Sequence, residues 1–192
     1  MKNHLVPEIV SSDVSIFTTD FEGCFLVSLT GSKDIRGSFI KTYNEASFEK
    51  LNLKTNFKDE FVTVSKKGTL RGFHIQLAPS DGGKLIKLLS GSAYDVALDL
   101  RKGSNKFGKT MSYLLTPDAP SIYLCAGVAH AFYALSDSTV MLYKCEADYD
   151  REKDVGILWS SVELDWPDEP IYISTRDRQF PNLQDFLQTS VF

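Results

Sequence analysis

Four polar side chains occur inside otherwise apolar segments of this 192-residue chain. They are His74 in GFHIQ, Lys84 in GGKLIKL, His130 in GVAHAF and Tyr143 in VMLYKC. A polar group that is buried without a hydrogen-bond partner destabilises the fold, so a buried polar side chain is expected to have such a partner or a functional role. A histidine base, a tyrosine acid and a lysine ammonium suit the abstraction of a proton next to a carbonyl. The four residues therefore predict proton-transfer chemistry, although a buried histidine or tyrosine can also be an ordinary, satisfied core residue.

The segment 70–84 reads as a short strand followed by a glycine-rich loop. Successive side chains of a strand point to opposite faces of its sheet. We therefore expect His74 and Gln76 to share one face, and Arg71 and Phe73 to share the other.

Other chemistries find little support in the sequence. Gly82-Gly83-Lys84 lacks the spacing of a phosphate-binding P-loop, and no Gly-x-Ser-x-Gly segment is present. Two histidines and a glutamine are a poor set of ligands for a transition metal, because His74-Ile75-Gln76 offers only one imidazole. We expect no metal and no cofactor, and a metal-dependent oxygenase is the least favoured of the enzyme alternatives.

Composition and charge restrict the partners. The chain is 43% hydrophobic and carries a net charge of −4 without a basic stripe, so we expect a folded core and no nucleic acid. Cys24, Cys125 and Cys145 are odd in number, lack Cys-x-x-Cys spacing and have no obvious basic neighbour. This pattern predicts reduced thiols in a cytoplasmic protein. Residues 1–20 do not resemble a secretory signal, and no apolar run could span a bilayer.

Strand-prone segments follow one another between residues 61 and 147, separated by turns rich in Gly, Pro and Ser-Asp. A spacing of roughly ten residues indicates an all-β sandwich or barrel. Two smaller features precede them, a half-buried strand at 38–43 and a helix at 45–51 capped by Asn44. Pro181 is expected to begin a last short helix with Leu183, Phe186 and Leu187 on one face.

Five segments carry a resemblance to a known family, and the match runs in order from about Asp34 to Pro181. They are LRGFHIQ, GKLIKLLSGSAYDVALDLRKGSNKFGK, CAGVAHAFYALSD, LYKCEADY and STRDR. The chain resembles the dTDP-4-dehydrorhamnose 3,5-epimerases, nucleotide-sugar epimerases of the cupin fold. The resemblance implies a single domain over 1–192 with a cupin-type jelly roll, or double-stranded β-helix, and a few short peripheral helices. We expect 1–20 to be a tail or edge strand, 25–149 the jelly-roll core, and 150–192 a C-terminal wrap.

The resemblance also implies roles for particular residues. His74 resembles the general base that removes the proton α to the C4 ketone of a 4-keto-6-deoxy sugar. Asp177 in STRDR resembles the carboxylate that orients this histidine. Tyr143 resembles the acid that returns a proton from the opposite face, and Lys84 the cation near the enolate oxygen.

A second set of residues resembles the family's substrate-binding positions. His130 and Arg71 correspond to residues that line the sugar and hold the diphosphate, Arg36 to an arginine at the nucleotide end, and Tyr149 to an aromatic of the same pocket. The full predicted set is Arg71, His130, Arg36, Gln76, Tyr149, Phe39 and Arg176. The resemblance further implies a nucleotide-diphosphate-sugar substrate and a homodimer in which the N-terminal strands cross to the partner.

Two segments depart from the family pattern. The family has F-x-x-E after the D-x-R-G turn, where this chain has Ser38-Phe-Ile-Lys41, and Q-x-N-x-S on the strand before LRGFHIQ, where this chain has Asp59-Glu-Phe61-Val-Thr63. The chain thus lacks polar side chains that would hydrogen-bond the nucleobase of the substrate. This loss favours a substrate with a different nucleotide. A GDP-linked 4-keto hexose or heptose is as plausible as the dTDP-linked 6-deoxy sugar, and inversion at C3, C5 or both stays open. The alternatives are a 3,4-ketoisomerase and a sugar-nucleotide-binding cupin without catalysis.

Overall fold

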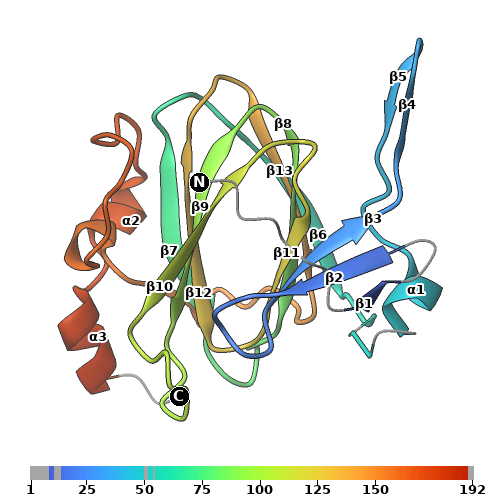
Figure 1. The fold of residues 1–192 in the computed structure, drawn as a ribbon. Coiled ribbons are helices and arrows are strands. Elements are labelled where there is room, and N and C mark those ends of the chain that lie inside the picture. Colours follow the sequence, from blue (N-terminus) through green and yellow to red (C-terminus); the bar gives the residue numbers. More distant parts are fainter. Residues whose placement is uncertain (1–8, 11–13, 50–51, 54, 190–192) are drawn as a thin grey trace.

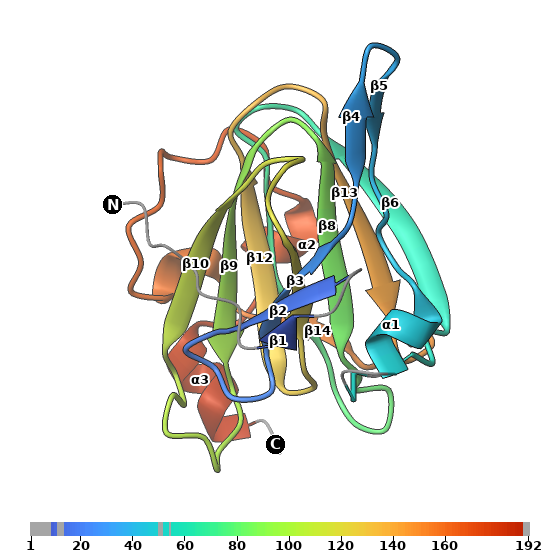
Figure 2. The same ribbon diagram turned by 45° about the vertical axis from the view of Figure 1, so that its right-hand side comes forward.

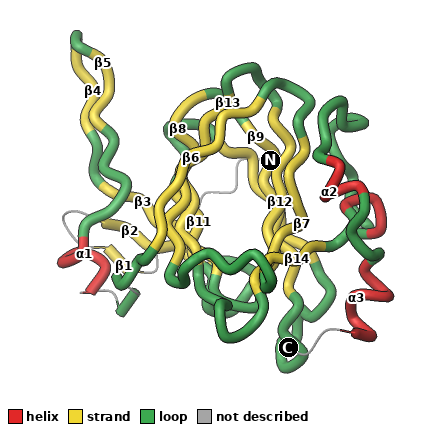
Figure 3. Tube along the Cα trace, turned by 180° about the vertical axis from the view of Figure 1, so that it is seen from behind, coloured by secondary structure: helices red, strands yellow, loops and turns green. Residues whose placement is uncertain are grey.

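Two antiparallel β-sheets face each other in the computed structural model, with the core between them (Figures 1 and 3). The structure describes residues 9–10, 14–49, 52–53 and 55–189. Within these residues, the first sheet has seven strands in the spatial order β1 (Ile9–Val10), β2 (Val14–Thr18), β3 (Phe25–Leu29), β11 (Ser121–Leu124), β8 (Lys84–Ser90), β13 (Thr139–Cys145) and β6 (Asp59–Ser65).

The second sheet comprises, in the described chain, five strands in the order β10 (Thr110–Leu115), β9 (Ala93–Asp99), β12 (Val128–Ala134), β7 (Leu70–Gln76) and β14 (Asp154–Gly156). Two short strands, β4 (Ser32–Asp34) and β5 (Gly37–Phe39), form a separate hairpin. The helices are short: α1 (Glu45–Glu49), the 3₁₀ turn η1 (Trp159–Ser161), α2 (Thr175–Arg178) and α3 (Leu183–Thr189). The architecture is thus all-β with short peripheral helices, as predicted.

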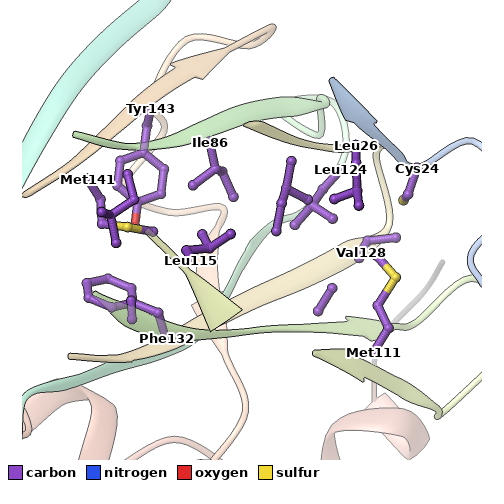
Figure 4. Packing of buried hydrophobic residues seen from close by; sticks show 14 of the residues in the cluster. Cys24, Leu26, Ile86, Met111, Leu115, Leu124, Val128, Phe132, Met141 and Tyr143 are labelled. Carbon is purple, nitrogen blue, oxygen red and sulfur yellow. The ribbon is translucent and has the colours of Figure 1, made fainter. Parts of the chain in front are cut away.

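The interior between the sheets is packed with side chains from both (Figure 4). Tyr143 points inward from β13 of the first sheet, and Phe132 lies opposite it on β12 of the second. The interior cluster includes Leu26, Ile86, Leu88, Met111, Leu124, Phe132, Met141 and Tyr143. Burial of this apolar surface is the main source of stability and makes the barrel a rigid support for polar residues on the same strands.

The outer face of the second sheet is covered by the C-terminal segment. Strand β12 is buried along its whole length, because its inner side chains face the barrel and its outer alanines face this cover. Phe186 of α3 is buried against that face, and Leu183 and Leu187 pack beside it as predicted. Trp166 contacts Phe73 of β7 at 6.0 Å between ring centroids. The C-terminal segment therefore holds the outside of the strand that carries His74.

Strands on either side of the range 25–149, which was predicted for the jelly-roll core, extend the sheets. Strand β2 pairs with β3, and β14 pairs with β7 through Gly156 and His74. Helix α1 begins where predicted, since the Ser47 backbone N–H donates to Oδ1 of Asn44 at 2.9 Å. The last two residues of the predicted helix, 50 and 51, lie outside the described residues.

The prediction of a half-buried strand at 38–43 is wrong. Strand β5 ends at Phe39, and both strands of the β4–β5 hairpin are exposed. The hairpin projects away from the barrel (Figures 1 and 2), so its alternating apolar residues meet no sheet face of their own chain. Ile35 at its tip is fully exposed, and Phe39 is 60% exposed.

Candidate active site

A cavity of about 250 Å³ brings strands of both sheets together. Eight of the predicted site residues line it, namely Arg71, His74, Gln76, Lys84, His130, Tyr143, Tyr149 and Arg176. Its other lining residues are Asp59, Phe61, Thr63, Ile75, Phe132, Cys145 and Asp154. The second sheet thus contributes His74 to this cavity, and the first sheet contributes Tyr143.

A bulge in β7 sets the direction of His74 and Arg71. His74 pairs with His130, but the next pair along the strands is Arg71 with Phe132, so β7 has one extra residue. Alternation is interrupted there, and Arg71 turns to the same cavity as His74. The expectation that Arg71 points away from His74 is therefore wrong.

Gly72 makes this bulge possible. Its φ of +121° is a conformation that side chains disfavour, and a Cβ atom there would lie 2.5 Å from the Cβ of Ala131. The close approach of β7 to β12 at this point therefore requires glycine.

Asp177 lies directly behind His74. Nε2 of His74 is 3.0 Å from Oδ2 of Asp177, a close approach without the alignment of a hydrogen bond. The Gly72 backbone N–H donates to the same oxygen at 3.1 Å, and Ser174 caps the helix that carries the carboxylate. Burial raises the pKa of Asp177, but the contacts with His74, Gly72 and Ser174 outweigh it and lower that pKa to about 2. The aspartate is therefore a buried anion that faces the imidazole.

Tyr143 is 6% exposed and enclosed by aromatic rings. Its ring stacks on that of Phe61, the residue directly opposite on β6, with centroids 4.8 Å apart and planes at 14°. His130 approaches it edge to face at 5.8 Å. Burial, and then the nearby Asp95 carboxylate, raise the pKa of Tyr143. The phenol therefore keeps its proton at neutral pH and can act as an acid.

His130 has a buried partner that the sequence predictions missed. Its Nε2 lies 2.7 Å from Oδ2 of Asp95, and both side chains are buried. Asp95 comes from β9, next to the strand of His130. An acidic residue among the alanines and valine of AYDVALD was a signal of an inward-facing charge.

Lys84 stands at the start of β8, opposite Cys145. Burial lowers the pKa of its ammonium, while Cys145 and Asp154 oppose that change. Two further polar residues of the cavity wall are held by hydrogen bonds. Arg71 Nε donates to Ser65 Oγ at 3.0 Å, and the Asp150 N–H donates to Oε1 of Gln76 at 2.8 Å.

Asp154 organises the remaining predicted residues at the cavity. It accepts a hydrogen bond from the Tyr149 hydroxyl at 3.3 Å and forms an ion pair with Arg176. Arg176 Nε also lies 3.5 Å from Oδ1 of Asp177. Asp154 was not predicted, because it occurs in a charged, turn-rich segment without a distinguishing pattern.

Two predicted residues lie elsewhere. Arg36 forms an exposed ion pair with Asp34 at 2.6 Å on the β4–β5 hairpin, and Phe39 stands on the same hairpin. Neither lines the cavity of His74 within this chain. The two departures from the family pattern are also separated, because Phe61 lines this cavity while Lys41 lines another.

Among the described residues, no three or more His, Cys, Asp or Glu side chains form a group that could hold a metal ion. No helix in the described part of the chain is long and apolar enough to cross a membrane.

The family model described as dTDP-4-dehydrorhamnose 3,5-epimerase matches residues 18–185. The chain belongs to this family. It is 35% identical over 173 residues to the epimerase of that name from Methanothermobacter thermautotrophicus, covering 87% of this chain and 93% of the relative.

Solved structures of epimerases agree with this assignment. The dTDP-4-dehydrorhamnose 3,5-epimerase from Bacillus anthracis, solved with TDP and PPi bound, has a TM-score of 0.83 and 34% identity, with 88% of this chain and 99% of that chain covered. The dTDP-6-deoxy-D-glucose-3,5-epimerase from Legionella pneumophila, solved with dTDP-4-keto-L-rhamnose, has a TM-score of 0.83 and 30% identity, with 89% and 93% covered. This member of the epimerase family is an isomerase with the cupin-type jelly roll.

The geometry of this family member suits proton transfer at a carbon. One wall carries an imidazole backed by a buried anion, and the other sheet carries a phenol that keeps its proton. A lysine whose ammonium is weakly solvated lines the same space. An imidazole, a phenol and a lysine side chain thus surround one cavity of about 250 Å³, an arrangement that suits proton transfer.

Proposed function

We propose that this enzyme inverts C3, C5 or both in a 4-keto-6-deoxy sugar that is linked to a nucleoside diphosphate, without a cofactor. The observation that carries the proposal is the presence of His74, with Asp177 behind it, and of Tyr143 in one 250 Å³ cavity. The C4 ketone makes the hydrogens on the neighbouring carbons acidic, so a positioned base is sufficient to remove one.

In the proposed reaction, His74 takes the proton from the carbon and becomes an imidazolium that the Asp177 carboxylate stabilises. The electron pair moves to the ketone oxygen and gives an enolate, whose charge Lys84 stabilises. Tyr143 then protonates the carbon from the opposite face, which inverts the centre. Burial raises the pKa of Tyr143, so its phenol holds the proton until the carbanion forms.

The nucleotide is proposed to be dTDP, because the relatives' names specify dTDP-linked sugars. A GDP-linked 4-keto hexose or heptose is the second candidate, favoured by Phe61 and Lys41 at positions where the family has an amide and an acid. Titration calorimetry with dTDP, GDP and CDP separates them. A clear preference for dTDP would end the GDP proposal.

We also propose a homodimer in which the β4–β5 hairpin reaches the cavity of the partner. The exposure of Ile35 and Phe39, and of Val62 and Val64 on the edge strand β6, supports this proposal. It is tested by mixing an Arg36→Ala variant with a His74→Asn variant under conditions that exchange subunits. Each mixed dimer would then hold one site with both native residues, and activity should reappear. No recovery in a demonstrated mixed dimer contradicts the proposal.

The test of the reaction itself is incubation of the purified enzyme with dTDP-4-dehydro-6-deoxyglucose in deuterated water, followed by NMR and mass spectrometry. Epimerisation predicts inverted stereochemistry and one deuteron for each inverted centre, which also counts the centres. A ketone found at C3 would show a 3,4-ketoisomerase instead. Tight binding with no exchange would show a binding protein without catalysis.

A further inference from the structure

Cys24 lies at the end of the barrel core remote from Tyr143 (Figure 4), where its thiol meets that of Cys125, which is far away in sequence. The sulfur of Cys24, at the start of the β3 region, lies 3.6 Å from that of Cys125, which follows β11. Cys24 is buried and Cys125 is partly exposed. Neither residue lines the cavity of His74, so the pair is separate from the site described above.

A guanidinium is held against the Cys125 sulfur. Arg101 Nη1 donates to that sulfur at 3.1 Å and to the Glu22 carbonyl at 2.6 Å. Its Nε and Nη2 donate to the two carboxylate oxygens of Asp99, at 2.9 and 2.6 Å. These contacts fix the cation, and a fixed cation favours a thiolate over a thiol. The expectation from the sequence that no cysteine has a basic neighbour is therefore wrong for Cys125.

The pKa values of the two thiols are shifted in opposite directions. The hydrogen bond with Cys24 lowers the pKa of Cys125; burial opposes this, Arg101 reinforces it, and the Asp99 carboxylate opposes it. The contact with Cys125, and then burial, raise the pKa of Cys24. Cys24 is therefore the weaker acid of the pair, and Cys125 is the sulfur that ionises first.

We propose that Cys24 and Cys125 form an oxidation site for hydroperoxides, with Cys125 as the attacking sulfur and Cys24 as the resolving thiol. A partly exposed thiolate beside a second thiol is the arrangement of cysteines that oxidise reversibly. The product disulfide would tie the start of β3 to the segment that leads into β12, the strand of His130.

The proposed chemistry has two steps. The Cys125 thiolate attacks one oxygen of the hydroperoxide and the O–O bond breaks, so that Cys125 becomes a sulfenic acid. The departing alkoxide or hydroxide takes a proton from solvent and leaves as an alcohol or water. The Cys24 sulfur then attacks the Cys125 sulfur, an S–S bond forms, and the sulfenic hydroxyl leaves as water with the Cys24 proton. The two thiols lose two electrons in total, which reduce the hydroperoxide. A small thiol would reverse the modification by exchange.

Cys145 provides a matched reference within the same chain. It is also partly exposed, but burial raises its pKa, and the nearby Lys84 only opposes that change. The reduced wild-type protein is treated with one equivalent of hydrogen peroxide, then alkylated, digested and analysed by mass spectrometry. We expect the peptides of Cys24 and Cys125 to be joined, and Cys145 to remain alkylated as a free thiol. Oxidation of Cys125 no faster than that of Cys145, or the absence of the joined peptides, would overturn the proposal.

Variants separate the two steps. Cys24→Ser should stop the reaction at a Cys125 sulfenic acid that a 1,3-dione reagent traps, and Cys125→Ser should leave Cys24 unreacted. Trapping at Cys24 instead would reverse the assigned roles and so contradict the proposal.

One measurement needs no substitution of either cysteine. In the reduced wild-type protein, the alkylation rate of Cys125 should reach half its maximum below the pH of about 8.5 that is typical of a free thiol. Arg101→Gln should move that midpoint upward. The same midpoint for Cys125 and Cys145 in the wild type would contradict the proposal even if the variants fail to fold.

Discussion

The imidazole of His74 and the carboxylate of Asp177 approach to 3.0 Å although 103 positions separate them in sequence (177 − 74). Helix α2, capped by Ser174, brings the carboxylate to the back of β7, and the Gly72 N–H fixes one of its oxygens. In the proposed reaction, a buried anion in this place stabilises the imidazolium that forms when His74 accepts a proton.

Asp177→Asn should therefore lower kcat by about 100-fold or more. The amide oxygen can still accept the hydrogen bond from the Gly72 N–H, so the fold should be retained. The measurement is steady-state turnover together with the melting temperature. Asp168→Asn, at an exposed position, is the control. Unchanged turnover in the Asp177 variant would show that His74 does not depend on this carboxylate.

The same aspartate predicts how stability changes in acid. Its pKa of about 2 in the folded state lies below the value of about 3.9 expected in the unfolded chain. The contribution of Asp177, about 2 kcal/mol by linkage, is therefore complete above pH 4 and is lost as the pH falls towards 2. Urea unfolding of the wild type and of Asp177→Asn across this range should show a steeper loss in the wild type. Parallel curves would contradict the prediction.

Phe61 covers one face of the Tyr143 ring from the edge strand β6. Phe61→Ala removes this contact and admits water beside the phenol, so kcat/KM should fall about tenfold. Because Phe61 is 43% exposed, the melting temperature should change little. Leu114→Ala is the control, since Leu114 is also an exposed strand residue but stands on β10 of the other sheet. Equal activity of the two variants would exclude this role for Phe61.

Gly72 and Gly37 offer a second matched pair. Their φ angles are +121° and +124°, but a Cβ at Gly72 would collide with Ala131 while one at Gly37 would meet no atom within 4 Å. In both alanine variants the strained backbone lowers the free energy of unfolding. In Gly72→Ala the collision with Ala131 lowers it by about 2 kcal/mol more. Denaturant unfolding should therefore show the larger loss for Gly72→Ala, together with loss of activity. Equal destabilisation would contradict the close packing of β7 on β12.

The strand pattern could be predicted because it depends on local signals. Strands β6 to β13 lie between residues 59 and 145, close to the range 61–147 in which the sequence predicts successive strands, since each is a short β-prone run between turn residues. The bulge at Gly72 could not be predicted, because it arises from the approach of a distant strand, and this explains the error for Arg71. The position of the hairpin at 32–39 could not be predicted either. The alternation of apolar and polar residues in this region does not show that the hairpin projects away from the barrel.

The candidate site was predictable to the extent that its residues stand in recognisable motifs. Eight of them line one cavity, but their partners Asp95 and Asp154 were missed. Asp95 stands in the segment GKLIKLLSGSAYDVALDLRKGSNKFGK, and Asp154 stands in none of the five segments. Arg101 beside Cys125 was missed for the same reason, since 24 residues separate them. Pairing between charged groups depends on the tertiary fold, and a single sequence does not contain that information directly.

The most direct test of the account follows solvent deuterium into the sugar in the wild type, His74→Asn and Tyr143→Phe. If His74 removes the proton and Tyr143 returns it, the wild type exchanges and inverts, and His74→Asn should neither exchange nor invert. Tyr143→Phe should still exchange at the acidic carbon, because the base remains, but should invert at least about 100-fold more slowly. Near-normal exchange in His74→Asn would contradict the central assignment.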